Sequence, residues 1–217
     1  MIDTIEKLRK HFPVNSAEAA DIERVGAVYP WRITEYYARL MDPADPGCPI
    51  RRQAIPDVRE LDSFGSEDPL EEEACSPAPG IIRVYPDRIA LVVTDRCPMY
   101  CRHCLRKRYR RDSSRDLRGE RLGRALEYIR GDSSIRDVLL TGGDPLMLSD
   151  NELNFILHAL RAVNHVEIIR IGTRALCVWP ERITESLAGL LAEYHPVWVN
   201  TQFNHPREIT PEAGRAA

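Results

Sequence analysis

From residue 88 onward, short apolar runs alternate with amphipathic segments, and this alternation limits the possible folds more than any other feature of the chain. The apolar runs lie in RIALVVTD, DVLLTGGD, VEIIRIGTR and PVWVNTQFN. Between them, apolar residues recur at helical spacing in GERLGRALEYIRG, SDNELNFILHALRAV and PERITESLAGLLAEY. Nearly continuous apolar strands that alternate with helices are typical of a parallel sheet covered by helices. We therefore predict an α/β fold with four strands in this part of the chain.

Polar residues or glycines follow each predicted strand. In folds of this kind the functional site lies at the carboxyl ends of the strands. Three of the six cysteines occur in CPMYCRHC, at residues 97–104, shortly after the first strand. We therefore expect Cys97, Cys101 and Cys104 to lie at the functional end of the sheet.

The beginning of the chain has a different character. Residues 1–41 contain helical patterns, as in SAEAADIERV and WRITEYYARLM. DPADPGCPI and SPAPG follow, and their prolines and glycines interrupt both helix and strand. We predict an N-terminal helical arm with an extended linker at residues 1–80, and a core domain at residues 81–217.

Charge and hydropathy narrow the choice of partners. The net charge of −3 does not indicate a nucleic acid or a membrane surface as partner. No run of about 18 apolar residues occurs, so we expect no transmembrane helix. The start, MIDTIEKLRKHF, lacks the apolar stretch of a signal peptide. We expect a cytoplasmic, reducing setting, where clustered cysteines bind metal or carry out chemistry more often than they form disulfides.

The cysteine spacing by itself leaves three interpretations open. A structural zinc site usually takes four ligands in two pairs, but only one CxxC pair is present, and His103 as a fourth ligand would strain a closed site. A thioredoxin-like redox pair leaves Cys97 unexplained. A [4Fe–4S] cluster takes thiolate ligands. Three thiolates would leave one iron open for another molecule.

Several stretches of the chain, taken together, resemble the lysine 2,3-aminomutase family of radical S-adenosylmethionine (SAM) enzymes. They are DPADPGCPIRRQAIP, DPLEEEACSPAPG, YPDRIALVVTDRCPMYCRHCLRKR, DVLLTGGDPL, IIRIGTR, PERIT and HPVWVNTQFNHPREIT. The Cys-x3-Cys-x2-Cys spacing after a first strand matches the radical SAM signature. The resemblance extends over nearly the whole chain, and the ordered series is far more specific than the cysteine spacing alone.

The resemblance implies a reaction and its cofactors. Cys97, Cys101 and Cys104 would hold a [4Fe–4S] cluster, and SAM would chelate the open iron. One electron, delivered by a reductase, would cleave SAM to a 5′-deoxyadenosyl radical that takes a hydrogen atom from the amino-acid substrate. Pyridoxal 5′-phosphate (PLP), bound to the substrate amino group, would let nitrogen migrate. The expected activity is an isomerase that interconverts L-lysine and L-β-lysine.

The resemblance also implies a partial (β/α) barrel of the radical SAM type behind the N-terminal helical arm. The strand pattern itself fits an open doubly wound sheet equally well. Relatives in the family are oligomeric, so a homo-oligomer is expected.

Roles for individual residues follow from the same resemblance. Gly142, Gly143 and Asp144 match the stretch that contacts the SAM amino group in the family. A GGD stretch on its own would indicate only a turn between a strand and a helix. Arg106 matches the residue that pairs with the substrate carboxylate, for which a planar guanidinium is well suited. The other arginines of this basic run are expected to be solvent-exposed.

Two further groups match cofactor positions. Tyr85 and Arg88 match residues that meet PLP, although an arginine at the start of a strand fits a surface ion pair as well. Arg174 follows the third strand and is expected to line the SAM or substrate pocket, together with Thr173, Asn204 and His205. His205 is not expected to be catalytic, because a lone histidine is more often structural.

Some positions depart from the family. Gln202 stands where relatives usually have His, Val84 where they often have Arg, and Leu105 where Thr is common. Gln donates a hydrogen bond but takes no charge. These departures affect the substrate and the affinity for PLP more than they affect the cluster.

The lysines of the chain do not match the position that forms an imine with PLP. They are Lys7, Lys10 and Lys107, and an imine requires a lysine amine. In the family that lysine and two substrate-binding aspartates follow well after the fourth strand. The expectation is a C-terminally truncated aminomutase. The alternatives are a non-isomerising iron–sulfur, SAM-binding protein, and a related enzyme acting on glutamate, arginine or a lysine used in translation-factor modification.

Overall fold

The computed structural model describes residues 1–62, 65–111 and 116–217. At the centre of this described part is a five-stranded sheet whose strands follow one another in chain order. β1 is antiparallel to β2, and the other neighbours are parallel. The strands are β1 (Ile81–Ile82), β2 (Arg88–Thr94), β3 (Asp137–Gly142), β4 (Ile168–Gly172) and β5 (Val197–Asn200). The predicted α/β class and four parallel strands are confirmed, whereas β1 is too short for a sequence pattern to reveal.

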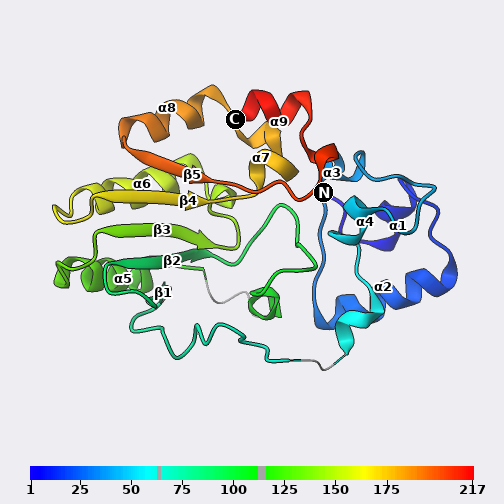
Figure 1. Cartoon of the computed structure of the whole chain (residues 1–217), viewed down its shortest axis with the longest axis horizontal. Coiled ribbons are helices and arrows are strands. Elements are labelled where there is room, and N and C mark those ends of the chain that lie inside the picture. The colour runs from blue at the N-terminus through cyan, green and yellow to red at the C-terminus, as the bar shows by residue number, and fades with distance from the viewer. Residues whose placement is uncertain (63–64, 112–115) are drawn as a thin grey trace.

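Three long helices connect the parallel strands (Figure 1): α5 (Gly119–Gly131), α6 (Asp150–Arg161) and α8 (Glu185–Glu193). Since the strand order runs in one direction and such crossovers are almost always right-handed, the helices belong to one face of the sheet. Leu91, Val138 and Ile169 share one buried core with these helices. A doubly wound sheet would reverse its strand order. The observed order is that of a partial (β/α) barrel.

The opposite face of the sheet carries a row of side chains in register across β2 to β5. The row consists of Ala90, Leu139, Arg170 and Trp198. Arg170 pairs with Asp137, with 2.8 Å between Nη2 and Oδ2. Trp198 is 62% exposed, and within the described residues β5 pairs with β4 alone. Ala90 and Leu139 are half-buried, so this face is most exposed at β5.

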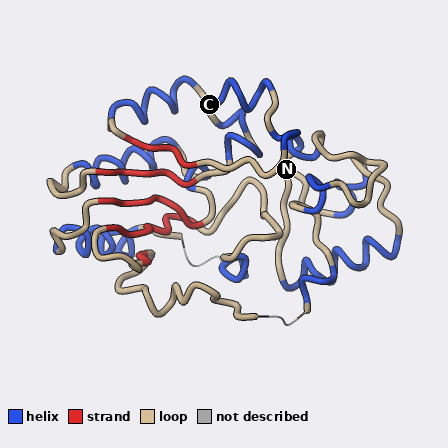
Figure 2. The backbone as a smooth tube through the Cα atoms, in the orientation of Figure 1, coloured by secondary structure: helices blue, strands red, loops and turns tan. Residues whose placement is uncertain are grey.

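The N-terminal segment forms α1 (Ile5–Arg9), α2 (Ser16–Val28), α3 (Glu35–Ala38), α4 (Pro49–Arg52) and the 3-10 turn η1 (Val58–Leu61). Its side chains build a second core, which also takes in Met99 and Cys177 from the sheet-bearing part. Figure 1 places these helices beside the carboxyl ends of the strands. Figure 2 shows that the connection from α4 to β1 is mostly loop. The predicted arm thus covers the end of the sheet that carries the cysteines.

Two helical patterns give shorter helices than expected. WRITEYYARLM contains only α3, and PERITESLAGLLAEY divides into the 3-10 turn η5 (Pro180–Arg182) and α8. The division occurs because Thr184 has an extended backbone and caps α8, accepting a hydrogen bond from the amide of Leu187. Within the described residues, no helix combines the length and apolar composition that a membrane-spanning segment requires.

Short elements fill the connections at the carboxyl ends of the strands and the end of the chain. They are η2 (Lys107–Arg111), η4 (Pro145–Met147), α7 (Ala175–Val178), η6 (Pro206–Glu208) and α9 (Pro211–Ala216). Because these elements are short, they leave the polar residues after each strand close to the sheet end.

Candidate functional site

A cavity of about 550 Å³ opens at the carboxyl ends of β2 to β5. Its volume is in the range of about 300–1,000 Å³ that is usual for small-molecule sites. Most of the residues singled out from the sequence line it: Cys97, Cys101, Cys104, Arg106, Gly142, Gly143, Asp144, Thr173 and Arg174. The tertiary structure therefore brings together three loops, after β2, β3 and β4, that are separated along the chain.

Tyr85 and Arg88 lie elsewhere. Both are described residues outside the lining of this cavity, at the amino-terminal end of β2. The guanidinium of Arg88 lies 4.9 Å from the ring centroid of Tyr85, and Arg88 Nε lies 3.4 Å from Asp87 Oδ1. Their assignment to PLP stays a prediction.

The loop that carries the cysteines is fixed by the N-terminal segment. Arg102 is buried and donates from Nε and Nη2 to the two carboxylate oxygens of Glu60, each at 2.9 Å. The amide of Arg102 donates to the carbonyl of Gln53 at 2.8 Å, and the amide of Tyr100 donates to the carbonyl of Arg32 at 3.0 Å. These bonds fix the loop against the N-terminal segment.

The thiols of this loop form a donor set that suits an iron–sulfur cluster. All six cysteines are described, and none of them is paired in a disulfide. In the ranges that the structure describes, no three His, Cys, Asp or Glu side chains converge as ligands of a single metal ion. A cluster binds its cysteines at different irons, so its thiols need not converge on one point. Three thiols in one loop are the kind of donor that a cluster takes, and their assignment as its ligands stays a prediction.

The thiol of Cys101 is buried beside the positively charged guanidinium of Arg174. Burial raises the pKa of the Cys101 thiol, and the positive charge of Arg174 offsets part of that rise. Arg174 Nη1 donates to Cys101 Sγ at 2.9 Å. A cation beside a buried thiol favours the thiolate, which is the form that binds metal.

Gly142 and Gly143 allow the end of β3 to pack against the cysteine loop. The amide of Gly143 donates to the carbonyl of Thr94 at 2.6 Å. Gly142 has a φ of +127°, and a Cβ there would lie 2.3 Å from the Thr94 oxygen. A Cβ at Gly143 would lie 2.1 Å from the Arg96 oxygen. The glycines are therefore required by the chain's own packing, in addition to any role toward a ligand.

Asp144 is buried, and its carboxylate accepts several hydrogen bonds from the same end of the sheet. The donors are the amide of Leu146 at 3.0 Å, the hydroxyl of Thr173 at 2.7 Å and the amide of Arg174 at 2.9 Å. Burial raises the pKa of Asp144, and these donors offset part of the rise. Asp144 thus joins the loops after β3 and β4.

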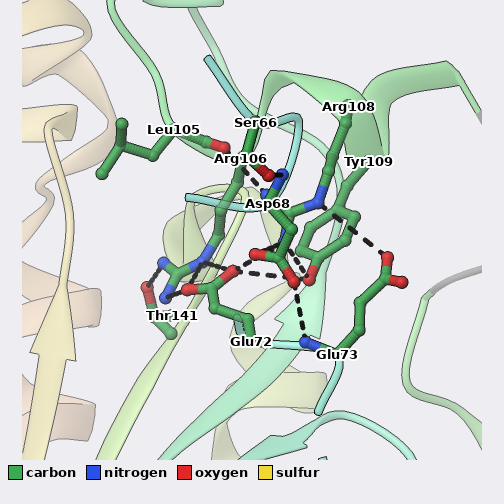
Figure 3. Close-up of polar contacts among 9 residues, drawn as sticks. All are labelled: Ser66, Asp68, Glu72, Glu73, Leu105, Arg106, Arg108, Tyr109 and Thr141. Atoms are coloured by element: carbon green, nitrogen blue, oxygen red, sulfur yellow. Dashed lines mark hydrogen bonds and ion pairs between the residues drawn. The ribbon is translucent and has the colours of Figure 1, made fainter. Parts of the chain in front are cut away.

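The residue predicted to bind a substrate carboxylate, Arg106, has a carboxylate partner within the chain (Figure 3). Glu72 lies 2.7 Å from Arg106 Nη2 and 2.9 Å from its Nε. Arg106 Nη1 donates to the hydroxyl of Thr141 at 3.3 Å. One edge of the guanidinium is therefore occupied by Glu72, while Nη1 points toward β3.

Glu72 also binds a second arginine of the same turn. Arg108 Nη2 lies 3.2 Å from Glu72 Oε2 and 2.6 Å from Asp68 Oδ1. The guanidinium of Arg108 lies 4.3 Å from the centroid of the Tyr109 ring (Figure 3). Two arginines of the basic run are thus partly buried ion-pair partners, and this differs from the solvated surface that the sequence suggests.

The lysines do not provide a site for PLP. Lys7, Lys10 and Lys107 are all described, and none of them lines the cavity. Lys107 Nζ lies 3.1 Å from Glu60 Oε2 and 4.5 Å from the centroid of the Tyr29 ring. The residues present therefore do not fit a PLP imine.

The end of the chain contributes to the site through Glu208. The backbone amide of His205 donates to Glu208 Oε2 at 3.2 Å, and Asn204 Nδ2 donates to Gln53 Oε1 at 2.8 Å. Asn204 and His205 are described residues outside the cavity lining, which includes Asn200, Thr201 and Gln202 instead. Sequence reasoning missed Glu72 and Glu208. Both lie in stretches that carry the family resemblance, but a single Glu in a loop gives no further signal.

A model of the radical SAM superfamily matches residues 91–216. The chain is 48% identical to an L-lysine 2,3-aminomutase of Clostridium subterminale over 99% of this chain and 52% of that protein. It is 45% identical to an L-lysine 2,3-aminomutase of Fusobacterium nucleatum, over 99% of this chain and 51% of that protein. A glutamate 2,3-aminomutase of Clostridioides difficile is 42% identical, again over 99% and 51%.

The chain spans about half the length of the curated relatives it matches. The matched region carries the three cysteines, the glycine turn after β3 and Arg174, which all line one cavity. The resemblance inferred from the sequence is confirmed, and the chain belongs to the radical SAM superfamily.

Proposed function

We propose that the whole protein is a radical SAM aminomutase that interconverts L-lysine and L-β-lysine with a [4Fe–4S] cluster, SAM and PLP. One observation carries the proposal: three cysteine thiols, a glycine turn and two arginines line a single cavity at the carboxyl ends of parallel strands. The similarity to named aminomutases supports the reaction class.

The chain's own residues hold and orient the reacting groups. When bound, the cluster supplies the electron that cleaves SAM, and PLP supplies the electron sink for nitrogen migration. Cys97, Cys101 and Cys104 hold the cluster. Gly142–Asp144 bind SAM at the turn after β3. Helices of the N-terminal segment pack against the loops that carry these residues, through a core that includes Met99 and Cys177.

Arg106 is the residue proposed to bind the substrate carboxylate. Its Nε and Nη2 are oriented by Glu72, and it lines the cavity near Thr141. A planar guanidinium has five donors, so it can serve two carboxylates on different edges. Glu72 thus prepares Arg106 for a second anion.

Lysine is the leading substrate, because two of the similar proteins described above are L-lysine 2,3-aminomutases. Glutamate is the next candidate, since a glutamate 2,3-aminomutase is similar over the same length. Arginine, or a lysine destined for a translation factor, completes the set of substrates to be tested.

We also propose where the enzyme works and which partners it has. Thiolate ligands must stay reduced, which suits the cytoplasm. A reductase delivers the electron, and the protein assembles as a homo-oligomer. No lysine of the described residues lines the cavity, so none is assigned to the imine with PLP, and Tyr85 and Arg88 are the residues proposed to contact its phosphate.

Anaerobic reconstitution with iron and sulfide tests the cluster. We expect the visible absorbance of a [4Fe–4S] cluster in the wild type and in Cys75→Ala, a cysteine outside the loop, and its loss in Cys101→Ala. SAM, PLP, reductant and either lysine or glutamate are then added, and the β-amino acid is measured by mass spectrometry. Bound zinc without iron, or an iron content unchanged by Cys101→Ala, would overturn the proposal.

A non-isomerising iron–sulfur, SAM-binding protein is the second candidate. The absence of a lysine among the cavity-lining residues that the structure describes favours it. In the same assay this protein would cleave SAM to 5′-deoxyadenosine without forming any β-amino acid.

A further inference from the structure

Arg174 occupies an unusual position between the cysteine loop and the end of the chain. It directly follows Thr173 after β4, and its side chain is only 11% exposed. Nη1 donates to Cys101 Sγ at 2.9 Å, whereas Nη2 lies 3.0 Å from Glu208 Oε1 and 3.1 Å from Gln53 Oε1. Nη1 is thus directed at the thiol of Cys101, whereas Nη2 is directed at the two oxygen acceptors and, at 3.5 Å, at Cys177 Sγ.

The direction of the guanidinium is fixed by groups outside the cysteine loop. Glu208 is fully buried, and the hydroxyl of Tyr37 donates to its Oε1 at 2.6 Å. The Gln53 amide donates to the same oxygen at 3.1 Å. The Tyr37 ring centroid lies 5.8 Å from the guanidinium carbon of Arg174. Tyr37 in α3, Gln53 directly after α4 and Glu208 in η6 therefore hold Arg174 in one orientation.

Charge balance alone does not explain this geometry. Glu208 already supplies an opposite charge to Arg174 through Nη2, with 3.0 Å between the atoms. Nη1 is nevertheless directed at Cys101 Sγ. Such a donor reduces the electron density on a ligating thiolate and stabilises the more negative, reduced form of a cluster. Hydrogen bonds to sulfur and nearby charge are known to set cluster potentials.

We propose that Arg174 is a positioning residue that orients Cys101 and raises the reduction potential of the cluster. This inference rests on the proposed function, since it requires that Cys101 be a cluster ligand. It assigns Arg174 a task toward the cluster itself, and it assigns Glu208, Gln53 and Tyr37 the task of aiming Arg174.

The test is a redox titration of the anaerobically reconstituted 217-residue chain without SAM, followed by electron paramagnetic resonance. Arg174→Gln is expected to make the cluster about tenfold harder to reduce, which is a shift of about 59 mV to more negative potential for one electron. Arg174→Lys, which keeps the charge and loses the planar fork, is expected to shift the potential in the same direction by less.

Arg182→Gln is the matched control. Arg182 is similarly covered, with 13% of its side chain exposed, but it binds Asp150 and the carbonyl of Leu146. It should leave the potential unchanged. Arg174→Gln alone leaves Glu208 buried without its cation, so this variant could fail to fold. The double variant R174Q/E208Q removes both charges, and its reduction potential is then compared with that of the wild type.

The outcomes separate the two claims. Wild-type protein that takes up no iron overturns the proposed function together with this inference. A wild type that carries a cluster, with an unchanged potential in Arg174→Gln or in R174Q/E208Q, overturns the inference alone. A loss of SAM affinity in Arg174→Gln at unchanged potential would likewise overturn it, because Arg174 would then serve SAM instead of Cys101.

Discussion

The carboxylate of Glu72 binds the guanidinium of Arg106 through Nη2 at 2.7 Å and through Nε at 2.9 Å. The side chain of Glu72 is 4% exposed and that of Arg106 24% exposed. The same carboxylate binds Arg108. A single acidic residue of the linker therefore pairs with two arginines of the segment after the cysteines, one of which also pairs with Asp68, and it joins the linker to the site.

We predict that Glu72→Gln destabilises the protein by about 3 kcal/mol, since Arg106 loses its carboxylate partner and Arg108 keeps only Asp68. Urea denaturation followed by circular dichroism would measure the free energy of unfolding. Glu73→Gln is the control, because its side chain is 63% exposed and its change should stay within about 0.5 kcal/mol. Equal stability of the two variants would contradict the importance of the Glu72 pairs.

Gly143→Ala is expected to displace the cysteine loop, because the added Cβ would lie 2.1 Å from the Arg96 oxygen. Backbone must move to relieve that contact, so we expect a loss of several kcal/mol of stability and poor iron incorporation. Gly189→Ala in α8 is the control. No atom lies within 4 Å of its added Cβ, and helix propensity predicts a gain of about 0.5–1 kcal/mol. Iron retained at wild-type level in Gly143→Ala would refute this account.

Stability should fall in acid through Glu208. Burial acts to raise the pKa of Glu208. Hydrogen bonds from the Tyr37 hydroxyl and the Asn204 amide outweigh it, together with the charge of Arg174, and they hold that pKa below its ordinary value of 4.5. A carboxyl group with a lowered folded pKa stabilises the fold above its unfolded pKa, and the stabilisation is lost as the pH falls through the folded pKa. The unfolding free energy of the cluster-free chain should therefore decrease below about pH 4.5.

The variant Glu208→Gln tests this pH dependence. Urea unfolding between about pH 7 and pH 3 should show a shallower acid slope than in the wild type. Glu193→Gln, on the exposed side of α8, should keep the wild-type slope. An identical slope in all three proteins would show that other carboxyl groups govern the acid response.

The start of α6 offers a smaller, local test. The hydroxyl of Ser149 accepts from the amide of Glu152 at 3.3 Å, and Glu152 Oε2 accepts from the amide of Ser149 at 2.9 Å. Ser149→Ala should cost about 1 kcal/mol in thermal or chemical unfolding. Asn151→Ala, at an exposed position of the same turn, should change stability by less than about 0.5 kcal/mol.

The sequence predicted those features that depend on local patterns. The four parallel strands follow from apolar runs, and the long helices between them follow from apolar residues at helical spacing. The position of the cysteines at the carboxyl end follows because Cys97 comes directly after β2. Local periodicity carries this information, since neighbours along the chain determine which face of a strand or helix is buried.

Only the tertiary structure decided what the site residues contact. Arg106 and Glu72 are 34 residues apart, and Arg174 and Cys101 are 73 apart. No local pattern specifies such pairs, because they form only when packing brings separate loops to one sheet end. For the same reason the order of the strands, which selects a partial barrel over a doubly wound sheet, required the three-dimensional structure. Sequence determined which groups are present, and packing determined which groups meet.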